Sequence, residues 1–343
     1  MLPSVTRRRA ALRHAMAPAT STALPGATSE TPRILLAAAV TLTVALWGSA
    51  FVGIRATLPA LGYANLASGR LLLAAATFGL LARRIGVRRP TRAQLPLLAG
   101  LGATGYAGYQ LLLSAGEQTV EAGTSALLLA AAPVLAAVLA RPILHERLSA
   151  RGGAGLAVAV AGVAVVAGTQ GADTGRLGGG APLVLAAVTL YALWVVLQKR
   201  ALATMTAVDV TAWATWFGAG LALPFASGLP HAVTTAPADA LANLLLLGII
   251  VTTVPFLLWT WTLARLNATA AAPLLLLVSP AALTVAWLWL GEAPAPAALA
   301  GGALTLAGVA TVQRGARTPE PARAPLPLVG ERGKRRPAFS ATN

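Results

Sequence analysis

Ten apolar runs, each close to the length of a membrane-spanning helix, dominate the sequence. They fall near residues 34–55, 63–82, 94–115, 122–143, 152–170, 179–198, 209–227, 240–264, 268–290 and 295–312. A helix rises about 1.5 Å per residue, so each run is about long enough to cross the ~30 Å hydrocarbon core of a bilayer. Because lipid offers no partner for backbone polar groups, we expect every run to be a helix.

The composition agrees with an all-α polytopic membrane protein. Of the 343 residues, 57% are hydrophobic and 10% are charged, whereas soluble domains have roughly 45–50% apolar and about 25% charged residues. So few charges cannot solvate a globular surface, which excludes a soluble enzyme, and so apolar a chain is not disordered. The chain has no cysteine, so it has neither a disulfide framework nor a cysteine metal site.

The net charge of +16 is concentrated in short clusters between the apolar runs. Arginines 83–92 separate the second and third runs, and Lys199 and Arg200 follow the sixth. With ten spans these clusters and both basic tails lie on one side, which the positive-inside rule makes cytoplasmic. We therefore expect a plasma-membrane protein with both termini cytoplasmic and no nucleic-acid partner; eight and twelve spans are the alternatives.

The chain also divides into two similar halves between polar ends. Residues 1–33 and 313–343 are too polar and basic to bury a core, so we expect disordered cytoplasmic tails, with Met16 as an alternative start. The predicted five-helix repeats are residues 34–170 and 179–312. Pairs that recur 146 or 147 residues apart are Trp47 and Trp194, Gly108 and Pro255, Pro133 and Pro280, Glu146 and Glu292, Gly155 and Gly301, and Gly162 and Gly308.

Such fixed spacings indicate an internal repeat, which shared hydrophobicity alone would not produce. Because five is odd, the second half must enter the membrane from the opposite side. The sequence therefore predicts ten transmembrane helices as two inverted five-helix repeats, an architecture that favours a secondary transporter working by alternating access. A channel or passive facilitator and a membrane-embedded lipid enzyme are the alternatives.

Several motifs follow a common family pattern, and the second half repeats the later ones at these spacings. They are Trp47-Gly48-Ser49-Ala50-Phe51, Arg70-Leu71-Leu72-Leu73, Pro133, Glu146-Arg147-Leu148, Gly155, Gly162-Val163, Pro280, Gly291-Glu292, Gly301 and Gly308-Val309. This pattern resembles the EamA-type transporters of the drug/metabolite transporter superfamily over about residues 34–312. The resemblance implies ten helices, cytoplasmic termini, and export or exchange of small metabolites. The chain departs from the family pattern at Glu117, where a basic residue is commoner, and at His145, which replaces a glycine.

Aromatic and amide side chains near mid-depth are the candidates for a substrate cavity. They are Trp47 and Ser49 in the first run, Tyr106, Tyr109 and Gln110 in the third, Tyr191 and Trp194 in the sixth, and Trp259 in the eighth. Aromatic walls with a few hydrogen-bonding groups suit small organic ligands, and ordinary packing is the alternative for each. Arg70 lies inside a predicted span, where a charge is costly. It either binds a substrate carboxylate or phosphate, or snorkels outward or pairs with Glu117 or Glu121.

Prolines and glycines mark candidate hinges and helix contacts. Pro133 and Pro280 lie near the middle of their runs, where a proline removes a backbone hydrogen bond and kinks a helix. We interpret them, with Gly108 and Pro255, as hinges beside the central site, and static kinks are the alternative. Structural roles are predicted for Glu146 and Glu292, as carboxylates near helix N-termini, and for Gly155, Gly162, Gly301 and Gly308, as close helix contacts.

No Asp or Glu lies at mid-depth in the predicted spans. Proton and cation sites in membranes normally use such a residue, so a neutral, zwitterionic or anionic metabolite, such as an amino acid, fits better than a cationic drug. The sequence also lacks nucleotide-binding and hydrolase motifs. We therefore expect a protein that is not an enzyme, needs no cofactor or metal, and has the lipid bilayer and a small-molecule substrate as partners.

Overall fold

The computed structural model describes residues 33–144, 150–169, 180–265 and 274–316, and every regular element in these ranges is a helix. In the first half the helices are α2 (Arg33–Leu61), α3 (Tyr63–Ile85), α4 (Leu95–Leu101), η1 (Gly102–Gly108), α5 (Tyr109–Gly116), α6 (Ala122–Leu129), α7 (Ala132–Leu144) and α8 (Ala150–Thr169). In the second half they are α9 (Gly180–Leu202), α10 (Ala207–Ala222), η2 (Leu223–Ala226), α11 (Leu229–Thr235), α12 (Ala238–Leu245), η3 (Leu246–Thr252), α13 (Thr253–Leu263), α15 (Val278–Leu290) and α16 (Pro296–Ala316).

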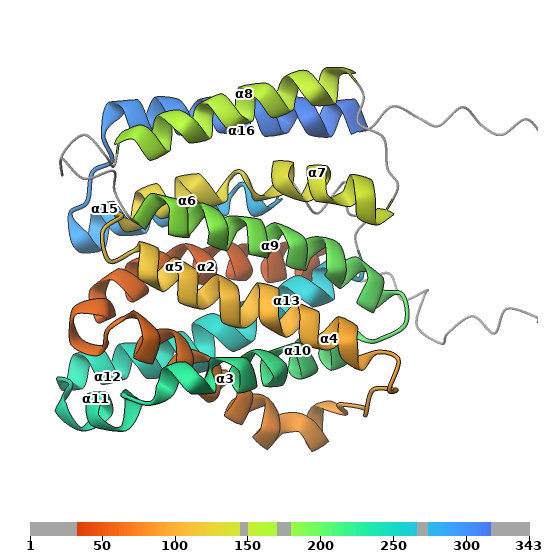
Figure 1. Cartoon of the computed structure of the whole chain (residues 1–343), viewed down its shortest axis with the longest axis vertical. Helices are drawn as coiled ribbons and strands as arrows, with labels where there is room; N and C mark the ends of the chain where they lie inside the picture. Colours follow the sequence, from red (N-terminus) through yellow and green to blue (C-terminus); the bar gives the residue numbers. More distant parts are fainter. Residues whose placement is uncertain (1–32, 145–149, 170–179, 266–273, 317–343) are drawn as a thin grey trace, which may run out of the picture.

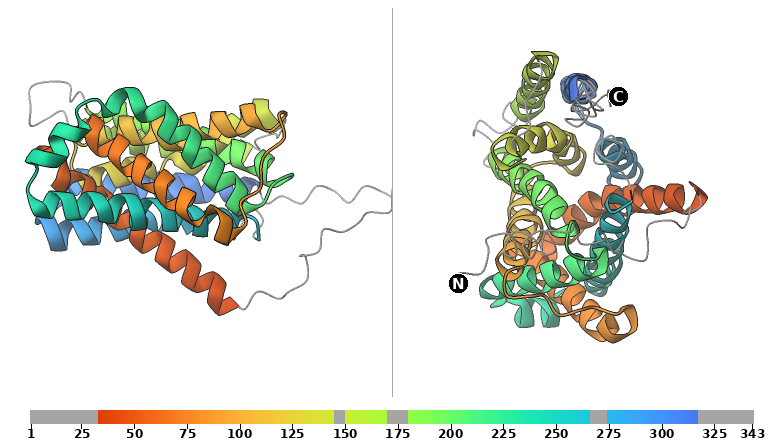
Figure 2. Two further views of the ribbon diagram at one scale, coloured as in Figure 1. Left: turned by 90° about the horizontal axis from the view of Figure 1, so that it is seen from below. Right: turned by 90° about the vertical axis from the view of Figure 1, so that its right-hand side faces the viewer.

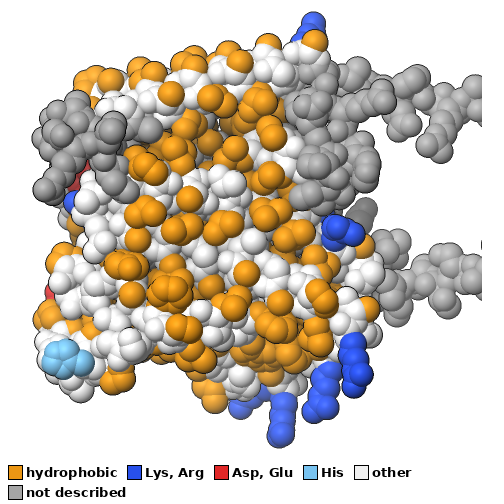
Figure 3. Space-filling view, viewed as in Figure 1, with side chains coloured by type: hydrophobic (Ala, Val, Ile, Leu, Met, Phe, Trp, Pro, Cys, Tyr) orange, Lys and Arg blue, Asp and Glu red, His pale blue; other side chains and the backbone are white. Residues whose placement is uncertain are grey.

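The long helices lie side by side in one bundle, from which the first part of α2 projects (Figures 1 and 2). Large apolar side chains are exposed on its sides; Leu80 is 83% exposed and Leu288 72%. Hydrophobic side chains cover much of the face in Figure 3, and Lys and Arg lie mainly along its right-hand edge. A soluble protein rarely exposes so large an apolar surface, so the sides of this bundle suit contact with lipid.

Four helical stretches are long and apolar enough to cross a membrane by length and composition. They are Arg33–Leu61, Tyr63–Ile85, Gly180–Leu202 and Ala238–Leu263. Shorter apolar helices occupy Ala122–Ala136, Ala150–Val166, Val278–Leu290 and Pro296–Val312. The protein is therefore an all-α chain whose apolar helices are typical of a membrane protein.

Two long helical stretches contain a π-helical segment. η1 separates α4 from α5, and η3 separates α12 from α13. The hydroxyls of Thr252, the last residue of η3, and Thr253, the first residue of α13, donate to carbonyls five residues earlier, at 2.7 and 3.2 Å. Side chains thus satisfy backbone acceptors that the wider turn leaves free. Gly108 is the last residue of η1, and Pro255 lies in the first turn of α13.

Two further stretches are interrupted before a proline. α6 ends at Leu129 and α7 begins at Ala132, while α15 begins at Val278 directly after a two-residue turn. Pro133 and Pro280 lie in the first turns of α7 and α15, where a missing N–H is tolerated. The structure thus differs from the expected single kinked helix over residues 122–143, because a proline that cannot donate to the preceding turn ends the helix instead.

The last helices of the two halves, α8 and α16, lie side by side (Figure 2) and approach at glycines. A methyl group on Gly155 would lie 2.7 Å from the carbonyl oxygen of Gly308, and one on Gly162 would lie 2.6 Å from that of Gly301. One on Gly308 would lie 2.4 Å from the backbone nitrogen of Ala159. Backbone meets backbone at these points, which only glycine permits. Glu146 lies outside the described residues.

We predict that Gly162→Ala lowers the thermal stability of the purified protein in detergent. The added methyl group clashes with the backbone of α16, and overpacking of this kind costs about 1–3 kcal/mol. Gly153→Ala is the matched control, since it lies in the same helix and a methyl group there has no neighbour within 4 Å. Equal melting temperatures for the two variants would show that this contact does not stabilise the fold.

Candidate substrate cavity

A cavity lies at the centre of the bundle, between the two halves of the chain. Only about 30 Å³ of it is open to the centre of a water molecule, which is room for very few waters. Its walls are Trp47, Ala50, Phe51 and Ile54 of α2, Arg70 of α3, Tyr109, Gln110 and Leu113 of α5, Tyr191 of α9, Val251 of η3, Phe256 of α13, and residues of both proline interruptions. The cavity is mostly aromatic and aliphatic, and in this conformation it is nearly closed.

Both interrupted helices present their breaks to this cavity. The lining residues there are Leu129, Ala130, Ala132 and Pro133 on one side, and Leu275, Leu276 and Val278 on the other. Pro133 has no N–H to give to the carbonyl of Leu129. In a membrane, irregular backbone of this kind is tolerated where it is buried in protein or lines a cavity. The breaks therefore lie where backbone groups are available to a ligand.

The structure brings five of the nine predicted cavity residues to the walls. Trp47, Tyr109, Gln110, Tyr191 and Arg70 line the cavity. The three aromatic rings among them form one cluster. The ring centroids of Tyr109 and Tyr191 are 5.1 Å apart, and those of Trp47 and Tyr191 are 6.3 Å apart. Such a wall is largely aromatic and carries few polar groups, as expected of a site for a small organic molecule.

The other four candidates lie outside the walls. Tyr106, Trp194 and Trp259 pack behind the lining rings, with Tyr106 4.6 Å from Phe256 between centroids. Ser49 donates to the carbonyl of Leu46 at 2.9 Å, so its hydroxyl is used within its own helix. Helical periodicity places a residue on a face but does not say whether that face meets a cavity or another helix.

Two aromatic wall residues, Phe51 and Phe256, are absent from the predicted set. Phe256 is the centre of the cluster, with ring centroids 5.5 Å from Trp47 and 5.4 Å from Trp194. Phe51 lies four residues after Trp47, and this spacing puts the two side chains on one helix face. The spacing was therefore a signal for Phe51, whereas the position of Phe256 depends on the π-helical segment before it.

Arg70 is buried, with 4% of its surface exposed. Its Nη2 donates to the hydroxyl of Thr252 at 3.3 Å, at the end of η3. Its Nε and Nη1 have no hydrogen-bond partner among the described residues. The guanidinium does not snorkel outward, and among the described residues it forms no ion pair with Glu117. A buried cation with unmade hydrogen bonds is costly, so it is a candidate for binding a ligand.

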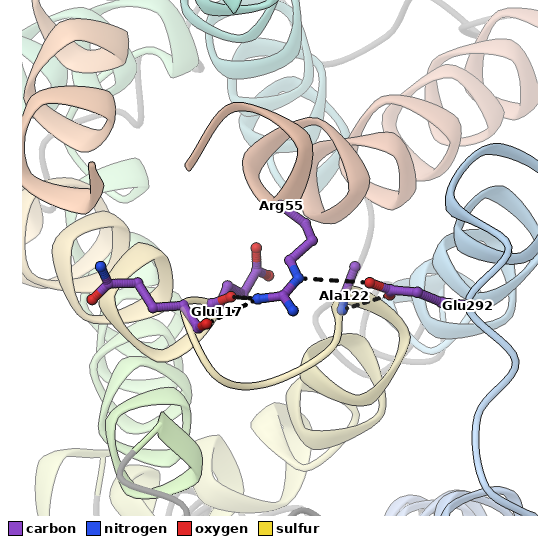
Figure 4. A network of polar contacts seen from close by, with 5 residues as sticks. Arg55, Glu117, Ala122 and Glu292 are labelled. Carbon is purple, nitrogen blue, oxygen red and sulfur yellow. Dashed lines mark hydrogen bonds and ion pairs between the residues drawn. The ribbon is translucent and has the colours of Figure 1, made fainter. Parts of the chain in front are cut away.

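A polar network lies at the end of the bundle where α5 and α15 end (Figure 4). Arg55 Nε is 3.6 Å from Glu292 Oε1, and Arg55 Nη1 donates to the carbonyls of Glu117 and, at 3.0 Å, Gln118. Glu292 Oε2 accepts from the backbone N–H of Ala122 at 3.1 Å. We call these five residues the end network. It ties α2 and the start of α6 to the segment after α15, and so joins the two halves.

Glu292 acts at a different helix from the one that the sequence suggests. The sequence places it just before α16, whereas its carboxylate accepts from the first residue of α6, Ala122. Gly291 has a left-handed backbone, with φ +69°, and ends α15 in the way that glycine commonly does. This turn directs Glu292 toward the other half of the chain, where the helix N-terminus attracts the carboxylate.

Glu117 follows α5 and is fully buried, and neither of its carboxylate oxygens has a hydrogen-bond partner in the described part of the chain. Burial raises its pKa well above the usual range, and the charge of Glu292 acts in the same direction. The positive charges of Arg70 and Arg55 oppose this shift in pKa. The carboxyl group is therefore close to two cations without being hydrogen-bonded to either.

Comparison with known proteins gives consistent results. A sequence model described as the EamA-like transporter family matches residues 34–168 and again residues 178–313. The chain is 41% identical, over 80% of its length and 92% of the relative's, to a probable terminal-alkyne amino-acid exporter of Streptantibioticus cattleyicolor. It is 33% identical, over 67% of its length and 75% of the relative's, to the uncharacterized transporter YdfC of Bacillus subtilis.

The fold also resembles that of a solved crystal structure. The two align with a TM-score of 0.56 and 18% sequence identity, over 83% of this chain and 98% of the other. At this identity the likeness concerns the fold alone. The family match covers most of the chain in two consecutive copies, and one relative is 41% identical over 80% of the chain. The chain therefore belongs to the EamA-like transporter family of membrane proteins.

Proposed function

We propose that this protein is a secondary transporter that exports or exchanges a small neutral, zwitterionic or anionic metabolite by alternating access. The observation that carries the proposal is the central cavity, whose walls come from both family-matched segments and include both proline interruptions. Binding sites in such transporters lie between the two repeats and are built from discontinuous helices. The similarity to a probable amino-acid exporter supports an amino acid or a related compound as substrate.

The described helices support ten crossings in two halves of five. In each half the third crossing contains a π-helical segment, the fourth is interrupted before a proline, and the fifth packs through glycines. This equivalence, at a spacing of five crossings, is what an inverted repeat requires. The end of the bundle that carries the Lys and Arg clusters is the cytoplasmic one in this proposal, and the end network faces outward in the plasma membrane.

The end network serves as the outer gate in this mechanism. It closes the outer end of the path to the cavity by joining the halves across Arg55 and Glu292, whose side chains are 32% and 18% exposed. A partly exposed ion pair contributes little to stability, about 0–1 kcal/mol. It is therefore weak enough to break in each transport cycle when one half rocks against the other.

We expect the purified full-length protein in proteoliposomes to take up common L-amino acids with saturable kinetics. Alternating access also predicts trans-stimulation, because a carrier that returns loaded moves faster than one that must return empty. The measurement is the initial uptake rate of radiolabelled amino acids with and without unlabelled amino acid inside. Single-channel currents, or flux that rises linearly with concentration, would identify a pore instead.

Reversing one charge of the outer gate should impair transport. Arg55→Glu or Glu292→Arg replaces attraction with repulsion and removes charge-assisted hydrogen bonds, each about 1.5–3 kcal/mol, so we expect the transport rate to fall about tenfold. The double swap should recover part of that loss. Asp239→Lys is the control, since Asp239 is exposed in the first turn of α12. A swap no better than either single variant would contradict the gate.

Removing the proline interruptions should slow transport without preventing membrane insertion. Pro133→Ala or Pro280→Ala restores a backbone N–H, which lets the broken stretch form a continuous helix. Pro296→Ala is the control, because Pro296 is the first residue of α16, where proline costs little. Initial rates are compared at equal membrane levels of protein. If both broken-stretch variants transport as fast as the control, the breaks are static kinks.

A further inference from the structure

Two buried ionisable side chains near the cavity, one basic and one acidic, have unmade hydrogen bonds. Arg70 is one of the cavity walls, and its Nε and Nη1 have no partner in the residues that the structure describes. Glu117 is completely buried, and both of its carboxylate oxygens are likewise unpartnered within those residues. Charges removed from water in this way are normally paired or hydrogen-bonded, so this arrangement requires an explanation.

Helix geometry places Glu117 at one end of the cavity. Gln110, Leu113 and Glu117 are spaced i, i+3 and i+7, so they lie on one face of α5 and its C-terminal end. Gln110 and Leu113 both line the cavity, and the Nε2 of Gln110 is also without a partner in the described ranges. Glu117 therefore lies beyond the last cavity-lining turn of α5, next to the end network.

The two charges are close but not joined. Arg70 is near enough to affect the ionisation of Glu117, yet no ion pair within 4 Å links them among the described residues. In Figure 4 the backbone carbonyl of Glu117 is bonded to Arg55, and no dashed line reaches its carboxylate. A buried guanidinium on the cavity wall and a buried carboxyl group just beyond that wall thus remain unjoined among the described residues.

We propose that Arg70 and Glu117 are the two halves of a clamp for the head group of a zwitterionic α-amino acid. The substrate carboxylate binds Nε and Nη1 of Arg70, and the substrate ammonium binds the carboxylate of Glu117. The side chain of the amino acid then lies against Trp47, Tyr109 and Tyr191. This inference rests on the proposed transport function and narrows its substrate class.

The clamp accounts for both unmade sets of hydrogen bonds with one ligand. A guanidinium presents two parallel N–H donors that match a carboxylate, and a carboxylate is the natural acceptor for an ammonium group. Because Arg70 is held by Thr252 at 3.3 Å, at the end of η3, the bound carboxylate contacts the first half through an arginine that is oriented by the second. A bound substrate is thus connected to both halves of the chain through Arg70 and Thr252.

The clamp is tested by direct binding to the purified full-length protein. Each common L-amino acid is measured for thermal stabilisation and then for affinity by calorimetry. The tightest binder is compared with its desamino analogue, which lacks the ammonium group, and its decarboxy analogue, which lacks the carboxylate. Both analogues should bind at least about tenfold more weakly, because a site built for a polar group rejects ligands that lack it.

The variants Arg70→Gln and Glu117→Gln assign each end of the ligand. Arg70→Gln should weaken binding of the amino acid about tenfold or more and leave the affinity for the decarboxy analogue unchanged. Glu117→Gln should weaken binding of the amino acid by a similar factor and leave the affinity for the desamino analogue unchanged. Without ligand, both variants should melt at or above the wild-type temperature, because each replaces a buried ionisable group that lacks partners with a neutral amide. Arg265→Gln is the control, since Arg265 is an exposed residue after α13.

The outcomes separate this clamp from the proposed function. If no common L-amino acid binds while proteoliposomes transport another metabolite, the clamp is wrong and the transporter stands. If either variant loses affinity equally for the amino acid and both analogues, or melts at a lower temperature without ligand, Arg70 and Glu117 have a structural role and the clamp is overturned. If no solute is transported at all but amino acids bind with the expected pattern, the transport proposal fails and the clamp stands.

Discussion

The pairing of backbone polar groups is the constraint on which the rest of this structure depends. A chain with this apolar composition crosses lipid only as helices, because lipid gives N–H and C=O groups no partner. The helical ladder is broken in the stretches that contain η1 and η3 and before Pro133 and Pro280. Both proline breaks and part of η3 lie on the central cavity. The hydrogen-bond requirement thus accounts for three of these four breaks lying at the cavity, where the proposed ligand binds.

The positions of charged groups also reflect whether each group has a bonding partner. The end network consists of partly exposed groups that pair with each other and with backbone carbonyls, so it is inexpensive to form and to open. Arg70 and Glu117 are buried, and among the described residues part of their hydrogen-bonding capacity is unused; in the proposed clamp the substrate completes it. A gate needs weak, exchangeable contacts, whereas a binding site needs groups whose bonds are completed by the substrate.

The hydrophobic pattern of the sequence predicted much of the helical content, but it predicted the residues of the cavity wall less completely. Each of the ten apolar runs contains described helix, because run length is a strong signal in a membrane protein. Tyr109 and Gln110 were identified with Tyr106 from their spacing, yet Tyr106 packs against Phe256 behind the wall. A helix that is apolar all round has no periodic signal that separates its cavity face from its packing face. For the same reason Phe256 was absent from the predicted set.

The sequence by itself determined that this chain is helical, that its halves resemble each other, and which glycines and prolines recur, because length, composition and spacing are local properties. Only the tertiary structure decided which partners these residues meet. It placed the carboxylate of Glu292 at the N-terminus of α6. Among the described residues it left Arg70 and Glu117 near each other without an ion pair, and it ended the helices before Pro133 and Pro280. Those outcomes depend on contacts between segments up to about half the chain apart, and no local pattern encodes the position of a partner in space.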